Sequence, residues 1–240
     1  MYQNMGYYGY GFDWTYLMVL AGAILSLIAS AKVNSTFQKY AKVRSMSGLT
    51  GAQVARRILD RNGLTDVPVE YVRGNLSDHY DPTTRTLRLS DSTYQSTSVA
   101  AIGVAAHECG HAIQHKESYG PMKLRTAIVP AANLGSRLGV PIILLGVFFG
   151  SGGNLLINIG IWVFSLAVLF QIVTLPVEFN ASSRALIMLE NYGILGQEEK
   201  RKAKSVLSAA AMTYVAAAAA SILQLLRLII LFGGRSNDRD

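Results

Sequence analysis

The sequence predicts an α-helical membrane protein with about four transmembrane helices and one small α+β domain. Charged residues make up only 15% of its 240 residues, against roughly 25% in an ordinary soluble domain. Half of the residues are hydrophobic. Charges are absent from residues 14–31, 138–177 and 205–226, which together form about a third of the chain. The polar remainder is therefore large enough for one small domain at most.

The composition also excludes several classes of protein. Leu, Ile, Val and Ala are too abundant for a disordered chain, and a single cysteine, Cys109, excludes a disulfide framework. The net charge of +7 could indicate nucleic acid, but no basic run is interleaved with aromatic residues. A basic excess beside apolar segments is more typical of loops held on the cytoplasmic side. We therefore expect a lipid bilayer, and no nucleic acid, as a partner.

The first transmembrane segment is predicted within residues 1–33. Its neutral part, 14–31, is close to the ~20 residues that cross a bilayer. Aromatic residues at one end form an interfacial belt: Tyr7, Tyr8, Tyr10, Trp14 and Tyr16. The alternative is a cleaved signal peptide, against which stand the missing basic residue before the segment and the length of its apolar core.

Residues 34–127 are predicted to form the first part of the polar domain. Apolar residues at helical spacing predict a helix over 47–63, with Thr50 as N-cap and Gly63 as its end. Short strands are expected at 67–72 and 86–90. The loop between them contains an Asp81-Pro82 turn signal. The order therefore includes two or three strands.

A second helix is predicted over residues 98–115, and a membrane hairpin over 128–175. The hairpin would consist of helices at 128–149 and 155–175, separated by a glycine-rich turn, with Pro176 closing the second helix. Two buried helices of a soluble protein are the alternative. Each of the two helices has ~20 residues without a charge, which favours the membrane hairpin over this alternative.

Residues 176–206 are predicted to complete the polar domain, and 207–240 to form a C-terminal helix and tail. The block 205–232 is alanine-rich at first and is later interrupted by Arg227. It could be a fourth, tilted span with Arg227 reaching an interface, or a helix packed on the polar domain. We favour the span.

Charge asymmetry predicts the orientation. Only Asp13 precedes the first span, whereas four basic residues follow it: Lys32, Lys39, Lys42 and Arg44. The positive-inside rule then places residues 32–127 and 176–206 in the cytoplasm and both termini outside. We expect a multi-pass protein of the cell membrane.

The predicted helix 98–115 contains the pattern His-Glu-x-x-His, formed by His107, Glu108 and His111. Residues four apart share a helix face, so both imidazoles can bind one zinc ion. Glu108 lies about 100° round the helix, in the position of a general base that activates water. The preceding strands could offer a sheet edge along which a peptide substrate lies.

Catalytic zinc sites usually have a third protein ligand. Glu178 is the best candidate, because it follows the neutral run on the side of the membrane assigned to the two histidines. An interfacial glutamate that only ends a span explains its position equally well. The next candidates are Glu190, and then Asp78 or Asp81.

Three motifs, SDHYDP, HECGHAIQ and TLPVEFNASSRAL, resemble the YugP-like family of bacterial membrane zinc metallopeptidases, over residues 47 to about 220. That family is similar in turn to the HtpX and Ste24 peptidases. The resemblance implies a zincin-like domain with one zinc ion per chain, His107, His111 and Glu178 as ligands and Glu108 as catalytic base. HtpX-type enzymes have Asp four residues after the ligand glutamate, where this chain has Ser182.

Two further residues are candidate catalytic groups. His79, in the predicted turn, could stabilise a tetrahedral oxyanion or hold the edge strand. Arg184, six residues after Glu178, could also stabilise an oxyanion, or could pair with a carboxylate. Cys109 points away from the metal and is interpreted as a buried packing thiol, and His115 as a residue behind the site or on the surface.

The leading hypothesis is an integral-membrane zinc endopeptidase whose site faces the cytoplasm. Its substrates would be membrane-associated proteins or peptides. The alternative is an inactive, zinc-stabilised membrane scaffold that binds a partner, against which the intact Glu108 speaks. A transporter is disfavoured, because the hairpin has no charged residue to form a pathway. The sequence predicts no oligomeric state.

Overall fold

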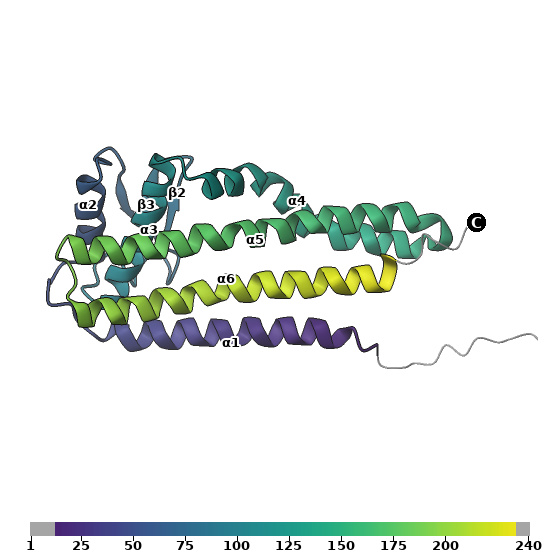
Figure 1. Cartoon of the computed structure of the whole chain (residues 1–240), viewed down its shortest axis with the longest axis horizontal. Helices are drawn as coiled ribbons and strands as arrows, with labels where there is room; N and C mark the ends of the chain where they lie inside the picture. The colour runs from purple at the N-terminus through teal and green to yellow at the C-terminus, as the bar shows by residue number, and fades with distance from the viewer. Residues whose placement is uncertain (1–12, 234–240) are drawn as a thin grey trace, which may run out of the picture.

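The computed structural model describes residues 13–233 and contains four long helices that extend from one small α+β region (Figure 1). Tyr7, Tyr8 and Tyr10 of the predicted aromatic belt lie outside the described residues. The elements in chain order are α1 (Tyr16–Ala41), α2 (Gly51–Arg61), β1 (Val69–Tyr71), β2 (His79–Asp81), β3 (Thr86–Leu89), α3 (Val99–Lys116), α4 (Gly120–Phe148), η1 (Gly150–Gly153), α5 (Asn154–Asn191) and α6 (Gln197–Phe232).

The predicted N-cap of α2, Thr50, is confirmed, and α3 begins and ends within one residue of its predicted range 98–115. Thr50 caps α2 through a capping box: its hydroxyl accepts a hydrogen bond from the Gln53 N–H, and the Gln53 side chain accepts one from the Thr50 N–H. Gly63 follows α2 with φ +65°, a conformation that favours glycine. Ser98 caps α3 by accepting from the Ala101 N–H at 3.2 Å.

The sheet has the order β1-β3-β2, with β1 parallel and β2 antiparallel to β3. Strand β2 lies where the sequence indicated a loop with a turn. The turn after Asp81 is present, but the three residues before it pair with β3. Two of these three side chains are polar and only Tyr80 is buried, so the pairing with β3, rather than an apolar pattern, creates the strand.

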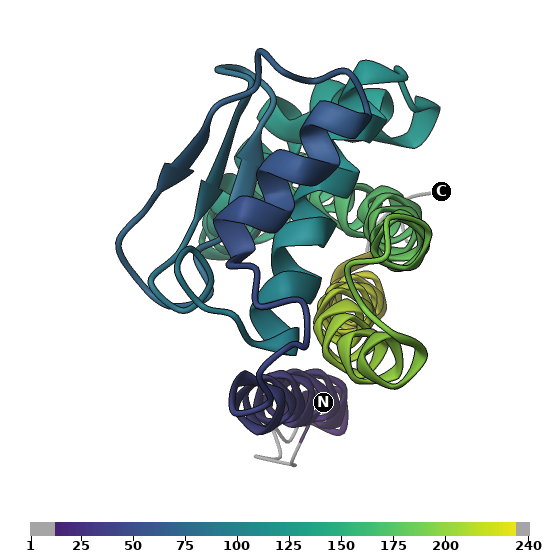
Figure 2. The same ribbon diagram turned by 90° about the vertical axis from the view of Figure 1, so that its left-hand side faces the viewer.

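The core of the α+β region lies between α2, the sheet and α3. Viewed along the bundle (Figure 2), the sheet lies on one side of α3, and α5 and α6 lie on the other. The fully buried side chains of this core come from all of these elements and include Ile58, Leu59, Leu87, Leu89, Ile102 and Leu189. Helix α3, which holds the two histidines, is thus packed from both sides.

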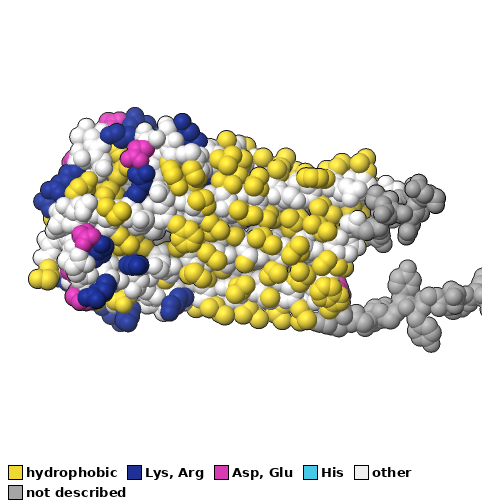
Figure 3. Space-filling model, in the orientation of Figure 1, with side chains coloured by type: hydrophobic (Ala, Val, Ile, Leu, Met, Phe, Trp, Pro, Cys, Tyr) yellow, Lys and Arg dark blue, Asp and Glu magenta, His cyan; other side chains and the backbone are white. Residues whose placement is uncertain are grey.

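Within residues 13–233, four helices, α1, α4, α5 and α6, are long and apolar enough to cross a bilayer. On the face shown in Figure 3, charged side chains gather at the end that holds α2 and the sheet, while hydrophobic side chains cover the long helices. Large apolar side chains such as Phe148, Leu155 and Trp162 are mostly exposed. Such a surface is typical of helices that contact lipid.

The hairpin is present, and its inner helix ends, predicted at 149 and 155, agree with the structure to within one residue, but both helices extend further at their outer ends. Helix α4 begins at Gly120 rather than near 128, since a helix can extend beyond its apolar part. Helix α5 does not end at Pro176 but continues to Asn191. An internal proline costs about 3 kcal/mol through its missing N–H and its ring clash. The segment after it offsets this cost by burying Val177, Ala181 and Ala185 completely.

Small residues bring α4 and α5 into close contact. A Cβ atom added at Gly135 would lie 2.3 Å from the Val163 carbonyl oxygen, and one at Gly160 would lie 2.5 Å from the Ile143 side chain. Glycines that let backbones approach are a common device of membrane helix pairs. The connection η1 is a short turn of glycines and one serine, as the sequence indicated.

Helix α6 has contacts with the α+β region and with α1, so its packing on that region leaves the predicted fourth span open. The N-terminal part of α6 packs on α3, where Gly103 meets Ala203. The C-terminal part runs beside α1 (Figure 1). Arg227 lies near the start of α1, with its guanidinium 4.4 Å from the Tyr16 ring centroid and its Nε 3.2 Å from the Thr15 hydroxyl.

Candidate metal centre

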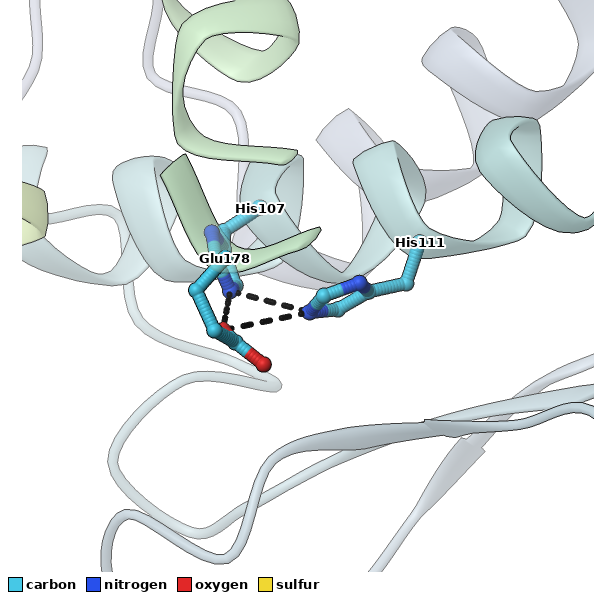
Figure 4. A group of neighbouring side chains, drawn as sticks. All are labelled: His107, His111 and Glu178. Atoms are coloured by element: carbon cyan, nitrogen blue, oxygen red, sulfur yellow. Dashed lines mark hydrogen bonds and ion pairs between the residues drawn. The ribbon is translucent and has the colours of Figure 1, made fainter. Parts of the chain in front are cut away.

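Helix α3 presents His107 and His111 on one face, one turn apart. Their Nε2 atoms are 3.1 Å apart. In Figure 4, dashed lines join both Nε2 atoms to the same carboxylate oxygen of Glu178. His111 is buried and His107 is half-buried. Both rings are therefore held at the inner end of a cleft rather than on an open surface.

Glu178 completes the group from α5, 71 residues after His107 in the chain. Its Oε2 atom lies 3.2 Å from His107 Nε2 and 3.5 Å from His111 Nε2, and its side chain is only 3% exposed. Within residues 13–233, these three form the one group of His, Cys, Asp or Glu side chains with the spacing for a metal ion. The third donor that the sequence left open between two interpretations thus lies beside the histidines.

A buried amide fixes the orientation of His111. Gln114 is fully buried and donates from Nε2 to the Val177 carbonyl oxygen at 2.8 Å and to Asn180 Oδ1 at 2.9 Å. Both of its N–H groups are thereby used, so its Oε1, 3.0 Å from His111 Nδ1, acts as acceptor. The His111 proton is on Nδ1, and Nε2 turns a lone pair toward Glu178.

Ser182 does the same for His107. Its Oγ lies 3.1 Å from His107 Nδ1, in the sequence position where the resembled HtpX-type enzymes have a carboxylate. A hydroxyl oxygen can accept the Nδ1 proton, and the Nε2 lone pair then faces the other two donors. With Nδ1 as the donor in both rings, two Nε2 lone pairs and the Glu178 carboxylate oxygen converge, an arrangement that suits a cation.

Comparison with known proteins agrees with this geometry. A family model described as "Putative neutral zinc metallopeptidase" matches residues 15–233. The chain belongs to this family. It is 53% identical over 215 residues to the "Putative membrane protease YugP" of Bacillus subtilis (strain 168), an alignment that covers 90% of this chain and 95% of the relative. No solved structure matches the chain.

Zinc, which the family description implies, fits these three donors. Zinc binds His nitrogen and carboxylate oxygen at about 2.0–2.2 Å in tetrahedral geometry, which separates two ligand atoms by about 3.4 Å. The donor atoms of His107, His111 and Glu178 are 3.1, 3.2 and 3.5 Å apart. Three protein ligands leave the fourth position open, as in catalytic rather than structural sites.

Glu108 lies beside these donors but not among them. Its Oε2 accepts a hydrogen bond from the Tyr80 N–H at 3.0 Å, and the residue is 8% exposed. This hydrogen bond connects the Glu108 carboxylate, on α3, to the backbone of strand β2. Glu108 is therefore positioned to act on a molecule in the cleft without being a ligand.

A cleft of about 400 Å³ opens over His107, Glu108, His111 and Glu178. Residues of β2, α3, α4, α5 and α6 line it. Two ionisable residues that the long helices contribute to this lining were not predicted as site residues from the sequence. Arg125, on α4, has its Nη1 3.3 Å from Glu178 Oε1, and Tyr214 lies on α6. Tyr214 could have been noticed as the one aromatic residue in the neutral block 205–226. Arg125 has no comparable signal, because its neighbours include other basic residues.

The two less certain catalytic candidates occupy different places. His79 lines the cleft from β2, with Nδ1 2.8 Å from the Ser77 carbonyl oxygen. Arg184 is not among the residues that line the cleft. It donates to Asn180 at 2.7 Å and pairs with Glu117 at 2.7 Å. Since Asn180 also accepts from the amide that orients His111, Arg184 lies behind the site, and its catalytic role stays a prediction.

The runner-up ligands have other partners. Glu190 pairs with Lys200. Asp78 lines the cleft, but its carboxylate accepts from the N–H and hydroxyl of Ser90, each at 2.8 Å. Hydrogen bonds from the Thr84 hydroxyl and the Thr83 N–H lower the pKa of Asp81 to about 2, so it stays ionised at the end of β2.

Two residues interpreted as structural have structural surroundings. Cys109 is fully buried and its thiol donates to the Ala55 carbonyl oxygen; burial raises the pKa of this thiol well above its ordinary value. His115 lies 2.9 Å from the Tyr80 hydroxyl through Nδ1. His115 is exposed, as one of the two interpretations expected, and it is not among the three clustered donors.

Proposed function

We propose that this chain is an integral-membrane zinc-dependent endopeptidase that cleaves protein or peptide substrates at the cytoplasmic face of the bilayer. The observation that carries the proposal is the triangle of His107, His111 and Glu178 donors with Glu108 beside it. The family membership and the name of the B. subtilis relative agree with a membrane protease. The relation to HtpX and Ste24 peptidases and a zincin-like domain are part of the same proposal.

One zinc ion per chain, held by the three donors, would supply a Lewis acid that acidifies water and polarises a carbonyl group. Glu108, held by the Tyr80 N–H, takes the proton of the attacking water and delivers it to the leaving amine. The Arg125 guanidinium and the Tyr214 hydroxyl line the same cleft. They are the groups best placed to stabilise the negative charge that develops on the carbonyl oxygen.

Strand β2 offers a way to hold the substrate. It is an edge strand, because among the described residues only β3 pairs with it, and its Tyr80 N–H points to Glu108. An extended peptide can add to such an edge through main-chain hydrogen bonds. In this proposal residues 34–127 and 176–206 form one catalytic domain into which the hairpin 128–175 is inserted.

The position of the site relative to the apolar surface favours substrates that approach along the membrane. The cleft is also lined by Val129 and Pro130 of α4, the helix that continues into the hairpin. A substrate whose cleavage site lies close to the bilayer surface would reach the cleft without leaving the membrane. The preference for membrane-associated substrates is an inference from this position.

The test combines metal analysis with cleavage of a generic protein substrate by the wild type and by Glu108→Gln. We expect both proteins to retain zinc, and the variant to cleave about 10²–10⁴-fold more slowly, the usual contribution of a general base. Glu198→Gln, an exposed glutamate at the start of α6, serves as the control and should cleave like the wild type.

Two outcomes would overturn the mechanism. If Glu108→Gln cleaves as fast as the wild type and a chelator does not slow the cleavage, Glu108 is not the general base. Zinc bound by both proteins without cleavage by either would favour the scaffold, in which the same groove binds a partner.

A further inference from the structure

A polar groove of about 530 Å³ lies between α1 and α6, away from the metal centre. Helix α1 contributes Lys32 and Lys39, two turns apart, together with the hydroxyl groups and the tyrosine between and beside them. Helix α6 contributes two serines and two apolar residues. The full lining is Lys32, Ser35, Thr36, Lys39, Tyr40, Ser205, Ser208, Ala209 and Met212.

The groove is basic and has no acidic side chain in its lining. None of the ion pairs within residues 13–233 involves Lys32 or Lys39. Within the same part of the chain, the Thr36 and Ser208 hydroxyls have no hydrogen-bond partner, whereas Ser35 and Ser205 donate to carbonyl oxygens of their own helices. Two cations and two available hydroxyl donors form a suitable site for an anion with several oxygen atoms.

The groove lies at the level along the bilayer normal where phospholipid headgroups are expected. Lys32 follows the neutral part of α1, and the 16 residues from Tyr16 to Ala31 rise about 24 Å, close to the ~30 Å of hydrocarbon in a bilayer. On α6, Ser205 is the first residue of the neutral block. Both helices therefore pass from the charged end into the apolar region at this groove. Figure 3 shows the same change from charged to apolar surface on the face that it draws.

Below the lysines, the two helices continue as an apolar surface. Ile28 and Leu25, one and two turns from Lys32 on α1, are 61% and 43% exposed, and Met212 on α6 is 51% exposed. An occupant with a charged head and a long apolar tail satisfies both parts of this surface. A free phosphate ion would satisfy only the first.

We propose that this groove binds the phosphate of an anionic phospholipid, with its acyl chains along α1 and α6. Basic pockets between membrane helices on the cytoplasmic side bind such headgroups elsewhere. The proposal does not depend on peptidase activity, since no residue of the groove belongs to the catalytic cleft.

The test uses the full-length protein in detergent and measures bound lipid by native mass spectrometry. The probes are phosphatidylglycerol and phosphatidylcholine with the same acyl chains, each with and without inorganic phosphate in excess. We expect the wild type to retain phosphatidylglycerol preferentially, and Lys32→Gln/Lys39→Gln to bind it about tenfold more weakly, since each basic residue near an anionic surface contributes to binding.

Two variants control for charge and for folding. Arg57→Gln/Arg73→Gln removes the same charge from exposed positions of the α+β region and should bind like the wild type. Lys32→Arg/Lys39→Arg should keep most of the binding. Equal binding of both lipids by the wild type, or undiminished binding by the lysine-to-glutamine variant, would overturn the proposal. Complete displacement by inorganic phosphate would assign the groove to a soluble anion and overturn the lipid as well.

Discussion

The residues behind the metal donors decide how well this site holds its metal. In this chain a hydroxyl, from Ser182, takes the place of the carboxylate expected behind His107, while Gln114 holds His111. Neither group adds charge to the site. The net charge of the ligand set is then supplied by Glu178 alone, and Arg125, 3.3 Å from its second oxygen, partly compensates it. Such a site should bind zinc less tightly than one with a second carboxylate.

Substitutions at Ser182 test this argument. Ser182→Ala removes the acceptor of the His107 Nδ1 proton, and we expect its zinc affinity to fall about tenfold, the lower end for partners of metal ligands. Ser182→Asp supplies a stronger acceptor and should bind zinc at least as tightly as the wild type. Competition with a chromophoric chelator measures both. Equal affinity in wild type and Ser182→Ala would show that packing alone orients the ring.

Among the elements, the contact between α3 and α5 matters most, because it brings the third donor to the other two. A Cβ atom at Gly110, which lies between the histidines, would be 2.7 Å from the Ala181 carbonyl oxygen of α5. Gly103, two turns earlier on α3, has 3.4 Å to the Ala203 side chain of α6. The two glycines therefore provide a matched pair of substitutions on one helix.

We expect Gly110→Ala to push α3 and α5 apart, at a cost of about 1–3 kcal/mol for overpacking, and to lose zinc on dialysis. Gly103→Ala places its methyl group at an ordinary contact distance and should keep both zinc and thermal stability. Metal analysis and thermal unfolding of the two variants make the comparison. Full zinc retention by Gly110→Ala would contradict the close packing of these helices.

How far the sequence predicts each element depends on whether local or distant residues determine it. Helices α2 and α3 begin at caps that are visible in the sequence, Thr50 and Ser98, so their starts could be predicted. Strand β2 exists through its pairing with β3, and α5 continues past Pro176 because its next turns are buried against α3. Neither cause can be found within the segment itself.

The same distinction applies to the site. His107, Glu108 and His111 lie within five residues and were predicted from their spacing. Glu178 needed a family resemblance, since periodicity left it undecided. Tyr214 reaches the cleft from a helix that the sequence assigned to the membrane, and Arg125 from a stretch of the polar domain in which no helix was predicted. Only the packing of the whole bundle brings them together.

For the whole molecule, the orientation in the membrane is the prediction that remains to be tested. Because Cys109 is buried, single cysteines can be added to the natural sequence. We expect a membrane-impermeant maleimide to label Gly152→Cys, at the hairpin tip, from outside intact cells. Asn75→Cys, in the loop before β2, should be labelled only after the membrane is opened. The reverse pattern would place the catalytic domain outside.

Helix α5 links the bilayer to the metal centre in a further way. It runs without interruption from the hairpin turn to Glu178 and beyond, whereas both histidines belong to α3, which is not among the candidate spans. If α5 crosses the bilayer as proposed, the metal donors are shared between a helix whose tilt responds to bilayer thickness and α3, which lies outside the candidate spans. Zinc affinity and helix tilt would then be linked: a membrane that shifts α5 relative to α3 would change the affinity for zinc, and bound zinc would shift the preferred tilt by the same free energy.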